Sequence, residues 1–168
     1  VFSLAANRKV TDEGVCFRNH VDGSPFTLTP ERAVEIQQAL GPDLFMALDE
    51  CPPADASRDD VARATARTHA WARRCRDHWT TRDTQALFGI VHGGLFKALR
   101  TESVEAIAEL DLPGHAVGGV SVGEDPAETD RIVACTAPQL DASKPRYLMG
   151  VGRPQDILRA VGHGVDLF

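Results

Sequence analysis

The fold is decided by a short apolar run that ends abruptly in histidine and glycine, LFGIVHGG at residues 87–94. Three further segments have the same form: LFMALDEC at 44–51, AVGGVSVGE at 116–124 and YLMGVG at 147–152. Near-continuous apolar runs are typical of buried parallel strands, and the segments between these four have helical patterning. The alternation predicts parallel βα units. In barrels of such units the chemistry lies at the carboxyl ends of the strands, where these motifs gather.

The remaining elements follow from turn and cap residues. Residues 14–20 and 26–28 flank the turn-forming segment DGSP at 22–25, which predicts a β-hairpin over about 14–29. Thr29 and Pro30 are suited to begin a helix that Gly41 ends. Further helices are expected at about 57–79, 97–109 and 126–137, and from Pro154 onward. With a fifth strand at 165–168, the sequence predicts an α/β fold: a partial (β/α)8 TIM barrel of about five βα units preceded by the hairpin.

Helical periodicity also predicts which side chains face the core. In the helix at 57–79 the expected buried positions are Val61, Ala64, Thr65, Thr68, Trp71, Ala72 and Cys75. In the helix that begins at Pro30 they are Ala33, Val34, Ile36 and Leu40, and in the helix at 97–109 they are Leu99, Val104, Ile107 and Ala108. The one conspicuous basic run, Arg63, Arg67, Arg73, Arg74 and Arg76, is expected to form a solvated helix face.

Length and composition limit the classes of protein to which the chain can belong. A chain of 168 residues can bury the core of one domain, and its formal net charge of −6 gives no overall basic character for nucleic-acid binding. A local basic patch would still be enough for a nucleic-acid substrate. Because a complete barrel needs about 250 residues, the sequence predicts a single partial-barrel domain over 1–168 that is a piece of a longer protein.

Cysteine usage and hydropathy indicate the compartment. The widely spaced cysteines, Cys16, Cys51, Cys75 and Cys135, favour neither a zinc site nor a disulfide framework within the chain. No apolar run approaches the roughly 18 residues of a membrane span, and no signal peptide is evident. We therefore expect a cytoplasmic protein with no membrane partner.

Taken together, the four motifs resemble those of the tRNA-guanine transglycosylases, also called queuine tRNA-ribosyltransferases, of the bacterial type. The segments DGS at 22–24, LTPE at 28–31 and GHGVDLF at 162–168 match as well, so the resemblance covers essentially the whole chain in order. It implies exchange of guanine at the anticodon wobble position of tRNA for 7-aminomethyl-7-deazaguanine, a step of queuosine biosynthesis. An aspartate nucleophile attacks the ribose, and a covalent aspartyl-ribose intermediate forms. The resemblance further implies tRNA as a partner, a homodimer, and a structural zinc whose ligands and subdomain lie outside this chain.

Asp49 is the first candidate for base binding. A carboxylate can accept two parallel hydrogen bonds from the N1–H and 2-amino groups of guanine, and the matching aspartate does so in the family. The alternative is a helix N-cap or a loop carboxylate. Cys51 matches a cysteine that lines the pocket of bacterial members, and it would equally serve as a small buried residue.

The other candidates come from the last three motifs. The resemblance assigns backbone contacts with the base to Gly119 and Val120, although glycine would also permit a tight bend. Met149 matches a residue that packs on the face of the base, and Gly150 follows it at the strand end. His92 departs from the family, which has glutamine there as a donor to the 6-oxo group of guanine. A histidine can donate as well, with pH sensitivity, or it can weaken binding.

No catalytic residue is expected within the chain. The resemblance places the nucleophilic aspartate immediately after Phe168 and the acid/base aspartate before Val1, so the chain alone is expected to be inactive. Two other interpretations stay open. One is a non-catalytic paralogue that binds tRNA or partners the catalytic subunit. The other, an unrelated phosphate-binding barrel, explains neither Asp49 nor the order of the motifs.

Overall fold

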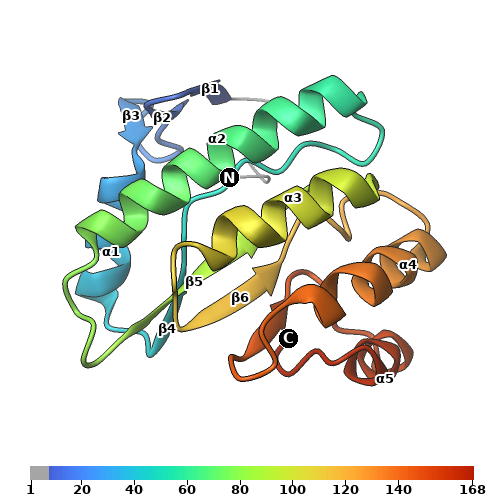
Figure 1. The fold of residues 1–168 in the computed structure, drawn as a ribbon. Helices are drawn as coiled ribbons and strands as arrows, with labels where there is room; N and C mark the ends of the chain where they lie inside the picture. The colour runs from blue at the N-terminus through green and yellow to red at the C-terminus, as the bar shows by residue number, and fades with distance from the viewer. Residues whose placement is uncertain (1–7) are drawn as a thin grey trace.

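The computed structural model describes residues 8–168, which form two β-sheets and a series of helices (Figure 1). The first sheet is antiparallel, in the order β1 (Arg8–Thr11), β2 (Gly14–Arg18) and β3 (Pro25–Leu28). The second is parallel, in the order β4 (Leu44–Met46), β5 (Ala86–Val91), β6 (Gly114–Val117) and β7 (Arg146–Leu148). The α-helices are α1 (Pro30–Leu40), α2 (Arg58–His78), α3 (Lys97–Ala108), α4 (Pro126–Thr136) and α5 (Pro154–Gly162).

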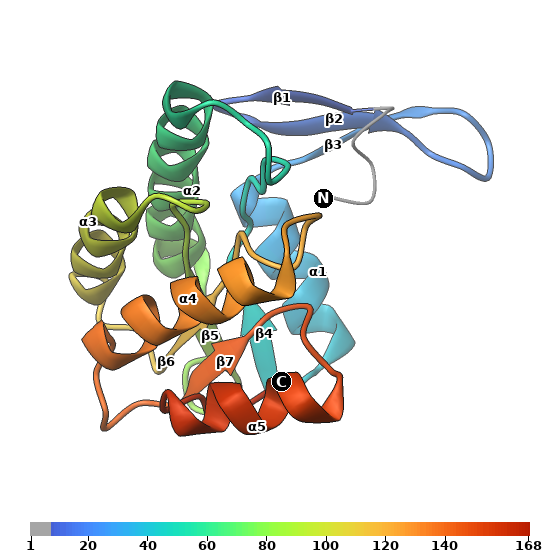
Figure 2. The same cartoon turned by 90° about the vertical axis from the view of Figure 1, so that its right-hand side faces the viewer.

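The parallel sheet is curled, and the helices alternate with its strands, so the predicted α/β class is confirmed. Each helix packs against the next along the chain, from α1 on α2 to α4 on α5 (Figures 1 and 2). This is the arrangement of a half-barrel, compatible with part of a TIM barrel. The expected strand at 165–168 is present only as a parallel bridge between Tyr147 and Leu167. The count of five βα units is therefore not confirmed.

The antiparallel sheet extends sideways from the half-barrel (Figure 2). Its β2–β3 pair is the hairpin predicted over 14–29, and the side chain of Asp22 accepts hydrogen bonds from the backbone and hydroxyl of Ser24 in the turn. Strand β1 was not predicted, because four residues with two adjacent basic side chains carry little strand signal. Residues 1–7, which the predicted domain 1–168 includes, lie outside the described residues.

Capping residues fix the helix ends as predicted. The hydroxyl of Thr29 accepts a hydrogen bond from the backbone of Arg32 and begins α1, while Gly41 ends that helix in the left-handed conformation with φ of 73°. Ser57 caps α2 in the same way through the backbone of Asp60. None of the helices within residues 8–168 has the length and apolarity needed to cross a membrane.

The predicted core is correct for α2, where all seven expected positions are buried. Two expectations for other helices were wrong. Leu40 is 78% exposed, because it is the last residue of α1 and Gly41 turns the chain away there. Ala108 is exposed at the end of α3, where Leu110 and Leu112 of the following segment enter the core instead.

The basic run on α2 is only partly a solvated face. Arg74 forms two hydrogen bonds, of 2.6 and 2.8 Å, with the carboxylate of Glu31 on α1, and it also binds the carbonyl oxygen of Asp12. These hydrogen bonds lower the pKa of Glu31 to about 2. Arg67 pairs with Asp12 and Glu50. The two arginines therefore join α2 to the antiparallel sheet, to α1 and to the end of β4.

Replacing Gly114 with alanine should destabilise the fold. A Cβ at this position would lie 2.3 Å from the ring of Phe88 on the neighbouring strand, so the ring would have to move within a packed core. We expect a loss of about 1–3 kcal/mol in the free energy of unfolding, measured by urea denaturation of the full-length protein. Gly162→Ala is the matched control, because no atom lies within 4 Å of its added Cβ. Equal stability of both variants would contradict the expected clash.

Candidate functional site

The residues that the sequence singles out for base binding lie at the carboxyl edge of the parallel sheet. They are Asp49 and Cys51 after β4, His92 after β5, Gly119 and Val120 after β6, and Met149 and Gly150 after β7. Because the four strands run parallel, these ends meet at one edge. The structure thus brings the candidates from four separate motifs into one region, while their role in binding stays a prediction.

The central contact of this region joins Asp49 and His92. The Nε2 atom of His92 lies 2.8 Å from Oδ2 of Asp49, and the two side chains are 1% and 20% exposed, respectively. An ionised carboxylate only accepts hydrogen bonds, so Nε2 is the donor. Burial by itself would raise the pKa of Asp49, but the hydrogen bond and the charge of His92 outweigh it and hold that pKa below its usual value. Asp49 is therefore an ionised acceptor at neutral pH.

The backbone of His92 is held by neighbouring helices. Its N–H donates to Oγ of Ser103 on α3 over 3.0 Å, and the same hydroxyl lies 2.8 Å from Nε2 of His69 on α2. Burial lowers the pKa of His69 to about 4, so this ring is neutral at physiological pH and can accept the Ser103 proton. Two helices thereby fix the strand end that carries His92.

The glycines after β6 permit a close approach that no other residue would. A Cβ on Gly118 would lie 3.1 Å from Nε2 of His92 and 3.4 Å from Sδ of Met149. A Cβ on Gly119 would lie 2.6 Å from Nδ1 of His92, and Gly119 has a positive φ of 62°. The ring of His92 therefore packs directly on this backbone, with Met149 beside it.

Cys51 follows β4 in the same region of the strand edge. Its side chain is buried, and the thiol donates a hydrogen bond to the carbonyl oxygen of Pro52 over 3.7 Å. Burial, together with the nearby charge of Asp49, raises the pKa of Cys51 to about 11. The thiol is thus protonated and unreactive at neutral pH, in agreement with a lining role rather than a nucleophilic one.

The carboxylate of Glu124 holds the loop after β6. Glu124 accepts hydrogen bonds from the backbone N–H groups of Ser121 and Val122 and from the hydroxyl of Thr129. The hydroxyl of Ser121 in turn donates to the carbonyl oxygen of Gly150 over 3.0 Å. The loops after β6 and β7 are therefore joined at the edge of the candidate site.

Sequence reasoning missed Arg100 on α3, which is completely buried. Its guanidinium donates to four backbone carbonyl oxygens, those of Val91, Gly94, Gly118 and Gly119. Burial lowers its pKa to about 10, so it is still charged at neutral pH. A signal was present in the sequence, because Arg100 is in phase with Val104 and Ile107 on the apolar stripe of α3.

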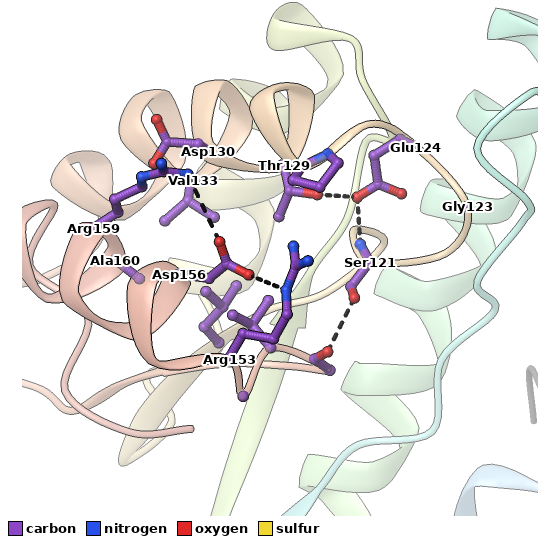
Figure 3. A pocket seen from close by; sticks show the side chains of 15 residues that line it. Ser121, Gly123, Glu124, Thr129, Asp130, Val133, Arg153, Asp156, Arg159 and Ala160 are labelled. Carbon is purple, nitrogen blue, oxygen red and sulfur yellow. Dashed lines mark hydrogen bonds and ion pairs between the residues drawn. The ribbon is translucent and has the colours of Figure 1, made fainter.

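Two cavities flank the candidate site rather than coincide with it. One, of about 360 Å³, lies between α4, α5 and the loops after β6 and β7, and Gly150 is the one base-site candidate that lines it (Figure 3). Its wall carries Glu124, Arg153 and Asp156, and Arg153 pairs with Asp156 over 2.7 Å. The other, of about 400 Å³, is mainly apolar and reaches Asp49 at its end. Within residues 8–168 there is no cluster of His, Cys, Asp or Glu that could hold a metal ion.

Comparison with known proteins gives one consistent family. A family model described as queuine tRNA-ribosyltransferase matches residues 1–168. Among curated proteins, the queuine tRNA-ribosyltransferases of Nostoc sp., Synechococcus elongatus and Halothermothrix orenii are 54%, 52% and 49% identical to this chain over 168 residues. These matches cover 100% of the chain and 45%, 44% and 45% of the respective relatives. The chain therefore spans less than half the length of these relatives.

Burial and the raised pKa of Cys51 predict slow alkylation. At mildly alkaline pH we expect iodoacetamide to label Cys51 at least about tenfold more slowly than Cys16, because only the thiolate reacts. Cys16 lies on β2 and is half-buried, which makes it the internal comparison. Mass spectrometry of the full-length protein after short exposure measures both rates. Labelling of Cys51 as fast as Cys16 would show that this part of the site is open to solvent.

Proposed function

The chain belongs to the queuine tRNA-ribosyltransferase family, and from this membership we propose that the protein containing it is a tRNA-guanine transglycosylase. The enzyme would replace guanine at the wobble position of tRNA with a 7-deazaguanine, for which we propose the substrate of the bacterial type, 7-aminomethyl-7-deazaguanine. The observation that carries the proposal is the ionised carboxylate of Asp49 at the strand edge, beside His92 and Cys51.

Asp49 has the chemistry to select guanine-like bases. Its two oxygens can accept the N1–H and 2-amino hydrogens in parallel, which adenine, cytosine and uracil do not present together. The lowered pKa keeps both oxygens as acceptors at neutral pH. Met149, with its polarizable sulfur near Gly118, would cover the face of the base.

We propose that His92 acts on the base through Asp49. Rather than pointing its Nε2 proton at a free pocket, it donates that proton to Oδ2 of Asp49. Since each carboxylate oxygen has two lone pairs, Asp49 can hold His92 and still accept both hydrogens of a base. In this arrangement His92 orients the carboxylate, and the 6-oxo group of the base needs another donor.

The bond-making step would use residues outside those described. An aspartate would attack the anomeric carbon of the ribose as the bond to guanine breaks, and the entering base would then displace the aspartate. We propose that the nucleophile and the acid/base aspartate belong to the longer protein, and that residues 1–168 alone are inactive. We also propose that the ligands of the structural zinc belong to the longer protein.

A second function is favoured by one observation. Because Nε2 of His92 already occupies Asp49, the barrel could belong to a subunit that binds tRNA or a catalytic partner without exchanging a base. The two functions differ in their response to radiolabelled guanine. An enzyme incorporates the label into tRNA, whereas a non-catalytic subunit binds tRNA and incorporates none.

Replacing Asp49 with alanine should abolish guanine exchange in the full-length protein. The paired hydrogen bonds to the base contribute on the order of 1–3 kcal/mol of discrimination, and no other described carboxylate lies at this position of the pocket. Incorporation of radiolabelled guanine into tRNA is the measurement. Asp43→Ala, at the opposite end of the same strand β4, should leave exchange unchanged. Near-normal exchange by Asp49→Ala would refute the pocket assignment.

Replacing His92 with glutamine should preserve or raise exchange near neutral pH. The amide can donate to the 6-oxo group, and Asp49 loses a competing donor. The pKa of Asp49 should rise towards its usual value, because His92 now lowers it. As the pH is lowered, guanine exchange by His92→Gln should therefore be lost at a higher pH than exchange by the wild-type protein.

The same guanine-exchange assay, repeated across a range of pH, tests the prediction for His92→Gln. His78→Gln, which removes the His78–Glu35 pair on the outer helices, is the control and should leave the profile unchanged. A large loss for His92→Gln at neutral pH would show that histidine has a specific role here.

A further inference from the structure

The guanidinium of Arg100 donates to both loops that follow β5 and β6. Its Nε donates to the carbonyl oxygen of Gly94 over 2.9 Å, and Nη1 donates to Val91 over 3.2 Å and to Gly118 over 2.6 Å. Nη2 donates to Gly119 over 2.9 Å. Within residues 8–168 no carboxylate forms an ion pair with this guanidinium. Its charge is instead satisfied by backbone carbonyls, two of which belong to the loop at the candidate base site.

These two carbonyl contacts fix the direction of two N–H groups. The peptide bonds of the described chain are all trans, and in a trans peptide the N–H points opposite to the C=O. With the oxygens of Gly118 and Gly119 bound to Arg100, the N–H groups of Gly119 and Val120 must point away from it. The N–H of Gly119 acts on the Cys51 sulfur, where it lowers the pKa of the thiol against the larger effect of burial.

The next part of the loop is held in a different way. The N–H groups of Ser121 and Val122 are already bound by the carboxylate of Glu124. Four successive N–H groups are thus divided between two charged residues. Glu124 binds the last two directly, while Arg100 orients the first two through the carbonyls that precede them.

We propose that Arg100 is a positioning residue of the base site, which holds the N–H groups of Gly119 and Val120 as donors to the 6-oxo oxygen of a guanine-type base. The proposal rests on the proposed function. Asp49 would take the N1–H and 2-amino edge, and the 6-oxo group is the next atom along that edge. Since Nε2 of His92 already donates to Asp49, we expect the N–H groups of the loop to donate to the 6-oxo group.

The helix that carries Arg100 is placed tightly enough for this role. A Cβ on Gly93 would lie 2.6 Å from the backbone nitrogen of Arg100 and 2.8 Å from the backbone of Leu99, so α3 touches the loop after β5. The planar fork of arginine matches four carbonyls at once. A lysine at 100 would keep the charge but could not reproduce the fork.

The test compares two bases on the full-length protein by isothermal titration calorimetry. Guanine and 6-thioguanine both present N1–H and the 2-amino group to Asp49, but sulfur is the weaker acceptor at position 6. We expect Arg100→Lys to weaken guanine binding by about tenfold and to weaken 6-thioguanine binding much less. The preference for guanine over 6-thioguanine would shrink accordingly.

Arg146→Lys is the matched control. Arg146 also donates to two backbone carbonyls, those of Gly164 and Leu140, but it lies at the start of β7, away from the site. It should keep the wild-type preference between the two bases. An Arg100→Lys protein that binds guanine as the wild type does, or that loses both bases by the same factor, overturns the proposal. A wild-type protein that binds neither base overturns the base site itself, and the proposal with it.

Hydrogen exchange on the wild-type protein keeps the test independent of how Arg100→Lys folds. Saturating guanine should slow exchange of the amides of Gly119 and Val120, with a smaller change at Ser121 and Val122, which Glu124 already holds. Unchanged exchange at Gly119 and Val120 in the presence of bound guanine would overturn the assignment.

Discussion

Arg100 joins the ends of β5 and β6 from a position with no exposure to solvent, and the geometry of the strand edge depends on it. A buried charge left unpaired costs several kcal/mol, whereas a hydrogen bond to a charged group contributes about 1.5–3 kcal/mol. The buried guanidinium is therefore stable only when four carbonyl groups all accept its hydrogen bonds, those of Val91, Gly94, Gly118 and Gly119. The cation selects one conformation of two glycine-rich loops that would otherwise have many.

A second contact, between the side chains of Asp49 and His92, orders the candidate site. Asp49 and His92 come from neighbouring strands, and their hydrogen bond fixes the carboxylate relative to the loop after β6. His92 is itself wedged against Gly118 and Gly119, so the ring cannot move without disturbing the backbone that Arg100 holds. The hydrogen bonds of Arg100 and the packing of the His92 ring thus constrain the same backbone, that of Gly118 and Gly119.

The sequence was sufficient to predict the α/β class and the strand ends that the structure brings to one edge of the sheet. Buried parallel strands such as LFGIV at 87–91 are unambiguous because they are apolar throughout, and Thr29 and Gly41 mark helix ends through local hydrogen bonds. The sequence could not predict the short strand β1 or the single bridge at Leu167, because tertiary contacts rather than local pattern decide both. For Arg100 the helical phase indicated an inward position, but the carbonyl groups that bind it are set by tertiary contacts.

His92 shows why the candidate site was only partly predictable. Residue type indicated that position 92 could donate a hydrogen bond, but which acceptor it meets depends on the distance between two strand ends. At 2.8 Å the nearest acceptor is Asp49, and the backbone N–H of His92 is fixed from behind by Ser103. A glutamine side chain is longer and uncharged, so it would reach further into the pocket and leave Asp49 to the base. Under the proposed function, an imidazole in place of an amide would transfer the donor from the ligand to the protein's own carboxylate, and the preorganisation of Asp49 would become part of the energy of base recognition.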